Sequence, residues 1–160
     1  MGIKRMNHAV LYVRDAERSA TFYRDVLGFR TVTEFPGGSF LQAPDSTNDH
    51  DIAFFSIGAG AGPSTAGRST VGLYHLAWEV GTLAELAEVG ARLQEAGSLV
   101  GASDHGSTKS FYAKDPDGLE FEVCWVVPAQ LLPPDVEVGT LPLDLERELE
   151  RYGALTPGGR

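Results

Sequence analysis

The sequence predicts an α+β fold in which two tandem β-α-β-β-β modules form one barrel-like domain with mixed sheets. The main observation is an internal repeat, because "NHAVLYVRDAERSATFYRDVLGFRTV" from Asn7 resembles "YHLAWEVGTLAELAEVGARLQEAGSLV" from Tyr74. Each copy begins with a histidine beside a short apolar run and continues into an amphipathic helix, a glycine and another strand-like run. Short alternating segments follow both helices, and these indicate strands.

The predicted domain covers residues 1–127, and a C-terminal tail with one short helix covers residues 128–160. Module one spans residues 6–57, a glycine-rich linker spans 58–70, and module two spans 71–127. The tail helix, "LDLERELERYG", carries a charge run that is typical of a solvated face, and "ALTPGGR" after it predicts a frayed end. We expect the tail to pack on the domain or on a second subunit.

Helix boundaries follow from capping residues. Asp15 is the predicted N-cap of the first helix, which ends near Gly28, because a carboxylate accepts from unpaired backbone N–H groups and glycine adopts the left-handed conformation at little cost. Thr82 and Glu85 form a predicted capping box for the second helix, which ends at Gly97. The strands expected after these helices are 30–35, 40–43 and 51–57, then 98–102, 109–114 and 119–127.

Composition limits the classes of partner. The formal net charge of −9 and the pI near 4.8 oppose binding to nucleic acids and to anionic membranes, so we expect no partner of either kind and a small molecule instead. No apolar stretch is long enough to cross a bilayer, which predicts a cytoplasmic protein. Cys124 is the only cysteine, which excludes a disulfide framework, and its apolar surroundings predict a buried packing residue.

Alternation along the predicted strands points to a metal site. His8 and His75 fall at matching positions of the repeat, on the strand faces opposite the helices, and Glu122 has the same parity in the last strand. A buried carboxylate must be paired, protonated or metal-bound. A lone histidine or glutamate in a strand is more often an ordinary polar residue, but the matching positions favour a site of two histidines and one carboxylate. Such a site suits Fe(II), with Mn(II) or another divalent metal as the alternative.

At this point the residues resemble the vicinal oxygen chelate superfamily, which includes glyoxalases, bleomycin resistance proteins and extradiol dioxygenases. The resemblance covers Met6 to Val127. It implies that each module forms an incomplete barrel, that the two modules enclose a metal held by His8, His75 and Glu122, and that the protein is a homodimer. The fold alone does not select the reaction.

The stretch "DHGSTKSFYAKDPDGLEFEVCW" resembles the signature of single-domain type I extradiol dioxygenases, which act on catechol-like diols with dioxygen. His105, Phe111, Tyr112, an acidic-Pro-x-Gly turn and Glu122 occur in the order of that signature. Ser103 departs from it, since the signature has glycine, asparagine, threonine or an aliphatic residue there. The resemblance implies that His105 and Tyr112 orient the substrate.

A second stretch, "NDHDIAFF", resembles the segment that brings a non-ligand histidine to the metal in these dioxygenases, which implies a catalytic role for His50. The alternative is that His50 is a loop residue. Glyoxalase-type isomerases commonly take a fourth ligand from the closing strand of the first module, where "IAFFSIG" has no carboxylate. Bleomycin-binding relatives generally lack the metal ligands. Fosfomycin-type thiol transferases share the two histidines and the glutamate, so only the signature residues His105 and Tyr112 argue against that alternative.

Overall fold

The computed structural model describes residues 2–136 and 139–159. The chain divides into two compact units, Met1–Ser64 with Pro116–Gly118, and Thr65–Asp115 with Leu119–Arg160, and each is described by itself. Within the described ranges, every helix is too short or too polar to cross a bilayer.

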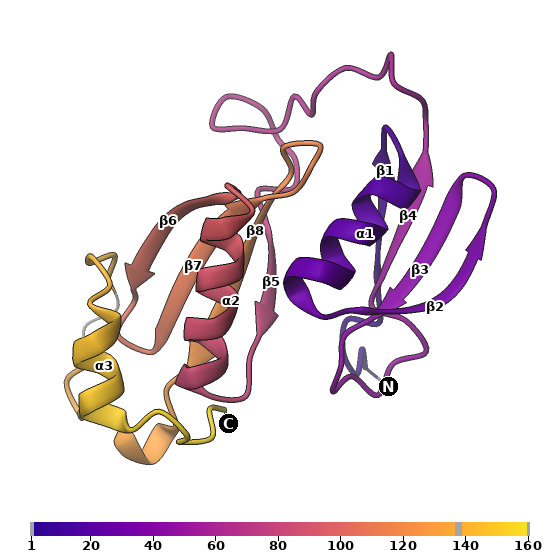
Figure 1. Ribbon diagram of the computed structural model, residues 1–160. Coiled ribbons are helices and arrows are strands. Elements are labelled where there is room, and N and C mark those ends of the chain that lie inside the picture. The colour runs from indigo at the N-terminus through magenta and orange to yellow at the C-terminus, as the bar shows by residue number, and fades with distance from the viewer. Residues whose placement is uncertain (1, 137–138, 160) are drawn as a thin grey trace. The chain divides into compact units, whose positions relative to one another are not determined.

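The first unit contains one four-stranded sheet and one helix (Figure 1). In the order β1-β4-β3-β2, β1 is parallel to β4 and the other neighbours are antiparallel. The helix lies across one face of this sheet and buries Tyr23 against Phe54 and Phe29. The elements are β1 (Ala9–Val13), α1 (Ala16–Leu27), β2 (Arg30–Phe35), β3 (Gly38–Gln42) and β4 (Ile52–Ser56).

The second unit repeats this topology, with the sheet order β5-β8-β7-β6 and β5 parallel to β8. Its core places Phe121, Val123 and Trp125 against α2, which confirms the predicted parity of the last strand. The two open mixed sheets confirm the predicted β-α-β-β-β modules. The elements are β5 (Leu76–Glu79), α2 (Leu83–Glu95), β6 (Leu99–Asp104), β7 (Thr108–Lys114), β8 (Glu120–Val126), η1 (Ala129–Leu131) and α3 (Leu145–Tyr152).

Both predicted helix caps are present. The Asp15 carboxylate accepts from the backbone N–H groups of residues 17 and 18, and Gly28 has the left-handed φ of 78°. Thr82 and Glu85 form the predicted capping box. Several strand boundaries differ from the predicted ones by one or two residues: β3 begins at Gly38, two residues before the predicted start, and β6 ends at Asp104, two residues after the predicted end. The ring of Phe35 packs on Gly38 so closely that a Cβ there would lie 2.3 Å from it.

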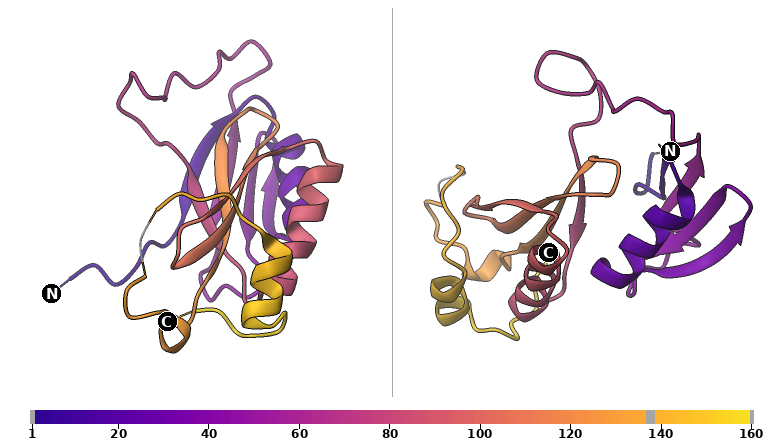
Figure 2. Two further views of the ribbon diagram at one scale, coloured as in Figure 1. Left: turned by 90° about the vertical axis from the view of Figure 1, so that its left-hand side faces the viewer. Right: turned by 45° about the horizontal axis from the view of Figure 1, so that its top comes forward.

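The prediction of a frayed C-terminus was wrong. The backbone N–H of Gly158 donates to the carbonyl of Gly81 (2.7 Å), and that of Gly159 donates to the carbonyl of Val126 (3.0 Å). Figure 2 shows the C-terminal end returning to the part of unit two where α2 begins. These bonds join chain segments far apart in the sequence, so local composition could not indicate them.

The charge run of the tail helix is also not wholly solvated. Glu148 in α3 is only 2% exposed, and its Oε2 lies 3.0 Å from Nζ of Lys109, a β7 residue that is itself 1% exposed. The helix is anchored further where the Tyr152 ring packs on Trp125, with centroids 5.4 Å apart. The tail therefore packs on the second module of its own chain, which is the first of the two predicted alternatives, packing on the domain or on a second subunit.

Replacing Gly158 by alanine should destabilise the protein. A Cβ at this position would lie 2.6 Å from Nε1 of Trp125 and 3.0 Å from the carbonyl of Val126, so the docked end must shift. We expect a loss of about 1–3 kcal/mol in the free energy of unfolding, measured by urea denaturation. Gly62→Ala is the matched control, because a Cβ there meets nothing within 4 Å. Equal stabilities of the two variants would contradict the docked end.

Candidate metal and substrate site

His75 and Glu122 lie together in the second unit. His75 directly precedes β5, and Glu122 is in β8, the strand parallel to β5, at the register position of Ala77. The Nε2 atom of His75 is 3.1 Å from Oε2 of Glu122, and both side chains are largely buried. The pairing of β5 with β8 therefore brings one of the two predicted histidine ligands into contact with the predicted carboxylate ligand.

The second carboxylate oxygen of Glu122 is held by Ser110, whose hydroxyl donates to Oε1 over 2.6 Å. Ser110 lies in β7 opposite Cys124, and both are buried on the same face of the sheet. Burial, with the Glu122 charge as a smaller cause, raises the pKa of Cys124 to about 12, so the thiol is protonated at neutral pH. Cys124 is thus the buried residue that the sequence predicts, while Oε2 of Glu122 faces His75.

Tyr112 and His105 form a hydrogen-bonded pair beside these groups. Tyr112 is opposite Glu122 in the β7–β8 register, and its ring centroid is 5.7 Å from that of His75. The Tyr112 hydroxyl is 2.7 Å from Nε2 of His105. Burial first, and then the negative charge of Glu122, raise the pKa of Tyr112 to about 12. The phenol is therefore protonated at neutral pH and available for hydrogen bonding.

The first unit brings His8 and His50 together. Their rings stack with centroids 4.3 Å apart, and Phe40 packs edge-on against His50 at 5.0 Å. Nδ1 of His8 lies 2.6 Å from the amide oxygen of Asn7, an atom that only accepts, so the neutral ring carries its proton on Nδ1. The Nε2 atom of His8 then has a free lone pair, as a metal ligand requires.

His50 is oriented by Asp49, whose Oδ2 lies 3.2 Å from Nδ1 of the ring. The backbone N–H of His50, more than its ring charge, lowers the pKa of the exposed Asp49 carboxyl below its usual value. Nε2 of His50 is buried and has no hydrogen-bond partner among the described residues. An imidazole with one nitrogen held by a carboxylate and the other unpartnered can accept or release a proton at the second nitrogen.

The loop that carries His50 is held by Asp51. Its carboxylate accepts from the Ala43 backbone N–H (2.8 Å), the Ser46 hydroxyl (2.8 Å) and the Asn48 side-chain amide (2.7 Å). The Asn48 amide also donates to the Asn7 carbonyl, 2.7 Å away, which ties the loop to the residue before His8. The sequence did not indicate this role of Asp51, whose only signal is a polar residue at the start of an apolar strand.

The His75 imidazole and the Glu122 carboxylate are two donors that a divalent metal accepts. Two ligand atoms about 2.1 Å from one ion and at right angles to each other lie about 3 Å apart. The 3.1 Å between His75 and Glu122 matches that separation, and the bond from Ser110 to Glu122 is the kind of support that a ligating carboxylate receives. One feature departs from the usual pattern, because Nδ1 of His75 is buried without a partner among the described residues.

The six predicted site residues thus fall into two groups. His75, Glu122, Tyr112 and His105 are neighbours in the second unit, and His8 and His50 are neighbours in the first. Across residues 2–136 and 139–159, no three His, Cys, Asp or Glu side chains gather closely enough to hold a metal ion. Ser110 was not among the predicted site residues, although its alternation with Tyr112 along β7 places it on the same face.

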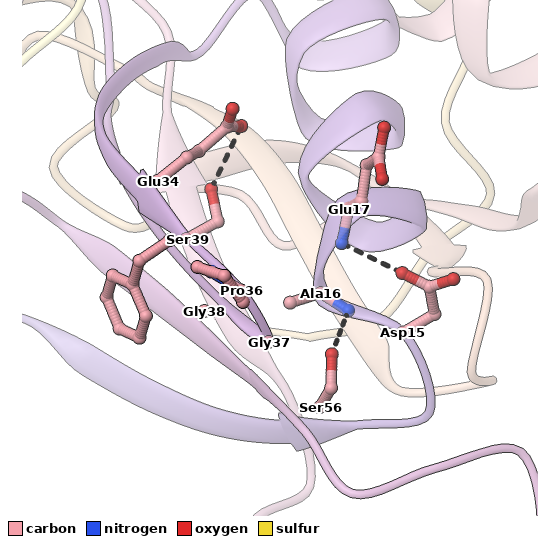
Figure 3. A pocket seen from close by; sticks show the side chains of 10 residues that line it. Asp15, Ala16, Glu17, Glu34, Pro36, Gly37, Gly38, Ser39 and Ser56 are labelled. Carbon is pink, nitrogen blue, oxygen red and sulfur yellow. Dashed lines mark hydrogen bonds between the residues drawn. The ribbon is translucent and has the colours of Figure 1, made fainter.

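A hollow of about 420 Å³ in the first unit lies away from these histidines. Figure 3 shows Asp15, Glu17 and Glu34 around it, at the N-terminus of α1. Its polar groups bond one another: the Asp15 carboxylate caps the helix, and the hydroxyl of Ser56 accepts from the Ala16 backbone N–H. We assign no chemistry to this hollow.

Comparisons with known proteins agree with the fold. The chain is 34% identical over 115 residues to biphenyl-2,3-diol 1,2-dioxygenase 3 of Rhodococcus globerulus, covering 71% of this chain and 59% of that protein. It is 32% identical over 152 residues to catechol-2,3-dioxygenase of Bacillus subtilis strain 168, covering 92% of this chain and 52% of that protein. The chain therefore spans little more than half the length of these curated relatives.

A solved structure has a similar fold. A glyoxylase/bleomycin resistance protein/dioxygenase domain from Frankia sp. EAN1pec superposes with a TM-score of 0.65 at 20% identity, covering 80% of this chain and 96% of that one. The family model for the glyoxalase/bleomycin resistance protein/dioxygenase superfamily matches residues 5–123. The chain belongs to this superfamily, which is also called the vicinal oxygen chelate superfamily.

Proposed function

We propose that this protein is an extradiol dioxygenase that cleaves the ring of a catechol-like diol, with a metal held by His8, His75 and Glu122. The observation that carries the proposal is the Glu122 carboxylate, which lies 3.1 Å from one histidine and beside the Tyr112–His105 pair. The relatives named as diol dioxygenases support the reaction class. The preferred metal is Fe(II), with Mn(II) as the alternative, since both accept this ligand set.

In the proposed reaction one molecule of diol and one of dioxygen give one ring-opened product. Both oxygen atoms enter the product, the ring C–C bond beside the two hydroxyls breaks, and no outside reductant is needed. When bound, Fe(II) would supply open positions at which the diol and dioxygen meet and would make the diol more acidic. Every other task falls to side chains.

The protein groups would orient the substrate and move protons. Ser110 would keep Oε2 of Glu122 directed at the metal position through its 2.6 Å bond to Oε1. Tyr112, held by its hydrogen bond to His105, would hydrogen-bond a substrate oxygen and so select one orientation of the ring. His50, held by Asp49, would take a proton at Nε2 from the substrate hydroxyl and return it as the product forms.

Oxygen uptake tests this proposal. Protein loaded anaerobically with Fe(II) should consume dioxygen when mixed with a catechol, in a 1:1 ratio, and form a coloured product absorbing in the visible range. The measurement combines an oxygen electrode with absorbance, over a panel of substituted catechols and hydroxynaphthalenes. Absence of uptake across the panel would refute the proposal.

The same superfamily contains other activities, and the assay separates them. An isomerase or a thiol transferase would require a thiol and consume no oxygen. A resistance protein that only binds its ligand would leave it unchanged and would not respond to chelators. Homodimer formation and cytoplasmic location remain predictions, the first to be tested by the mass of the protein in solution.

A further inference from the structure

The C-terminal segment, residues 139–152, contacts the turn that carries His105. We propose that this segment is a positioning element of the substrate site, which holds His105 in one tautomer and so makes the Tyr112 oxygen a hydrogen-bond acceptor toward the substrate. The tautomer of His105 does not depend on the proposed function, but the effect of this segment on catalysis rests on it. The segment lies beyond residues 5–123, the part of the chain that the superfamily model matches.

The contact that carries the inference joins His105 to Gly139. Nδ1 of His105 is 2.7 Å from the carbonyl oxygen of Gly139. A carbonyl oxygen only accepts, so Nδ1 must carry the proton. The neutral ring has a single N–H, which leaves Nε2 as an acceptor for the Tyr112 hydroxyl 2.7 Å away. Turning the ring over would place carbon atoms against both oxygens, so the two bonds together determine its orientation.

The direction of these bonds determines what Tyr112 offers to a ligand. A phenol has one proton, and here it points to His105. The Tyr112 oxygen therefore presents lone pairs to the site and accepts from a hydroxyl or amine. A substrate oxygen that carries a proton is favoured there over a carbonyl or ether oxygen, because two acceptors facing each other leave both unpaired. This is the selectivity that recognition of a diol requires.

Backbone pairing holds the Gly139 carbonyl in place. Leu141 and Asp104 exchange two hydrogen bonds, of 2.8 Å and 2.9 Å, at the edge of β6. The turn after Asp104 is closed by the bond from the His105 N–H to the Thr108 carbonyl, 2.9 Å away. Gly139 is two residues from Leu141, and His105 follows Asp104. The backbone pairing of Leu141 with Asp104 therefore sets the distance between the Gly139 carbonyl and the His105 imidazole.

A buried cluster of charged side chains also holds the turn at Asp104 against the tail. Nζ of Lys109 is 2.5 Å from Oδ1 of Asp104 and 3.0 Å from Oε2 of Glu148 in α3. The same Asp104 oxygen accepts from the Gly106 backbone N–H at 2.7 Å. Asp104 thus contacts the tail directly through its backbone bonds to Leu141, and its side chain is linked to Glu148 of the tail through Lys109.

The test compares Leu141→Pro with Leu141→Ala. Proline removes the N–H that donates to the Asp104 carbonyl, whereas alanine keeps it and trims a side chain that is 64% exposed. The sequence has only four histidines, so long-range proton–nitrogen NMR can resolve each imidazole, with His105→Asn to assign the signal. Spectra are recorded near pH 8.5, where imidazole is ordinarily neutral, without metal and with diamagnetic Zn²⁺.

We expect His105 to be protonated at Nδ1 in the wild-type protein and in Leu141→Ala. In Leu141→Pro the signal should move toward the Nε2–H form or become a mixture of both. Protonation at Nε2 in the wild-type protein would overturn the inference by itself, even if the proline variant failed to fold. A folded Leu141→Pro protein, judged by circular dichroism, that kept the Nδ1–H form would also overturn it.

Activity provides the second readout. For the iron-loaded enzyme, Leu141→Pro should lower kcat for ring cleavage by roughly 10- to 100-fold with iron content unchanged. Leu141→Ala should match the wild type, and an unchanged kcat in the proline variant would contradict the positioning role. If no variant consumes oxygen, the proposed function fails, while the NMR result still decides the tautomer.

Discussion

Glu122→Ala is expected to abolish metal binding and, with it, oxygen uptake. The substitution removes the carboxylate that lies 3.1 Å from Nε2 of His75 and leaves the Ser110 hydroxyl without its acceptor. Loss of a ligand should weaken affinity by more than the 10- to 100-fold typical of a group that only supports one. The measurement is iron content after loading and desalting, expected to fall from about one ion per chain to below about a tenth.

Glu120→Ala is the matched control. Glu120 lies two residues earlier in the same strand, has the same charge and is only half-buried, so its loss should leave metal content unchanged. His75→Ala and His8→Ala extend the test to the other two proposed ligands. Unchanged iron in the Glu122 and His75 variants would refute the ligand assignment, and unchanged iron in His8→Ala alone would remove only that histidine from it.

Among the substitutions predicted to change stability, Lys109→Met should cause the largest decrease in the free energy of unfolding. The ammonium group is 1% exposed and lies between Asp104 and Glu148, so its removal leaves the buried Glu148 carboxylate without its cation. Breaking a buried ion pair from one side typically costs about 3–5 kcal/mol in the free energy of unfolding. Urea denaturation at neutral pH measures this loss.

Lys114→Met provides the control for this prediction. Lys114 ends the same strand and is exposed, so its substitution should change stability by less than about 0.5 kcal/mol. Adding Glu148→Gln to Lys109→Met should recover part of the lost stability, because no buried charge then remains on α3. Equal effects of the two lysine substitutions would contradict the buried cluster.

The effect of Lys109→Met should depend on pH. Burial tends to raise the pKa of Asp104, but hydrogen bonds from Lys109 and the Gly106 N–H outweigh it and hold the pKa below the ordinary value of 3.8. A carboxyl whose pKa is lowered by folding stabilises the folded state above its unfolded pKa and loses that contribution as the pH falls through the folded value. The difference in the free energy of unfolding between the wild-type protein and Lys109→Met should therefore become smaller as the pH falls below 3.8.

The local elements and the parity of Glu122 could be predicted because their causes lie within a few residues. Asp15 caps a helix through N–H groups two and three residues away, and the Thr82–Glu85 box spans a single turn. Alternation along a strand placed Glu122 and Cys124 on the face opposite Trp125. The repeat then related His8 to His75 without any knowledge of their surroundings.

The docked tail and the support of the site depend on contacts between distant segments. Lys109 has no local feature that separates it from an exposed strand lysine, yet in the structure it is buried and Glu148 of the C-terminal helix α3 lies 3.0 Å from its ammonium group. Gly139 approaches His105 across 34 residues through its backbone carbonyl, a group that every residue has. Side-chain type and spacing therefore determined the modules and the candidate ligands, whereas the tertiary structure alone decided which groups orient them, since burial and backbone contacts exist only once distant segments pack together.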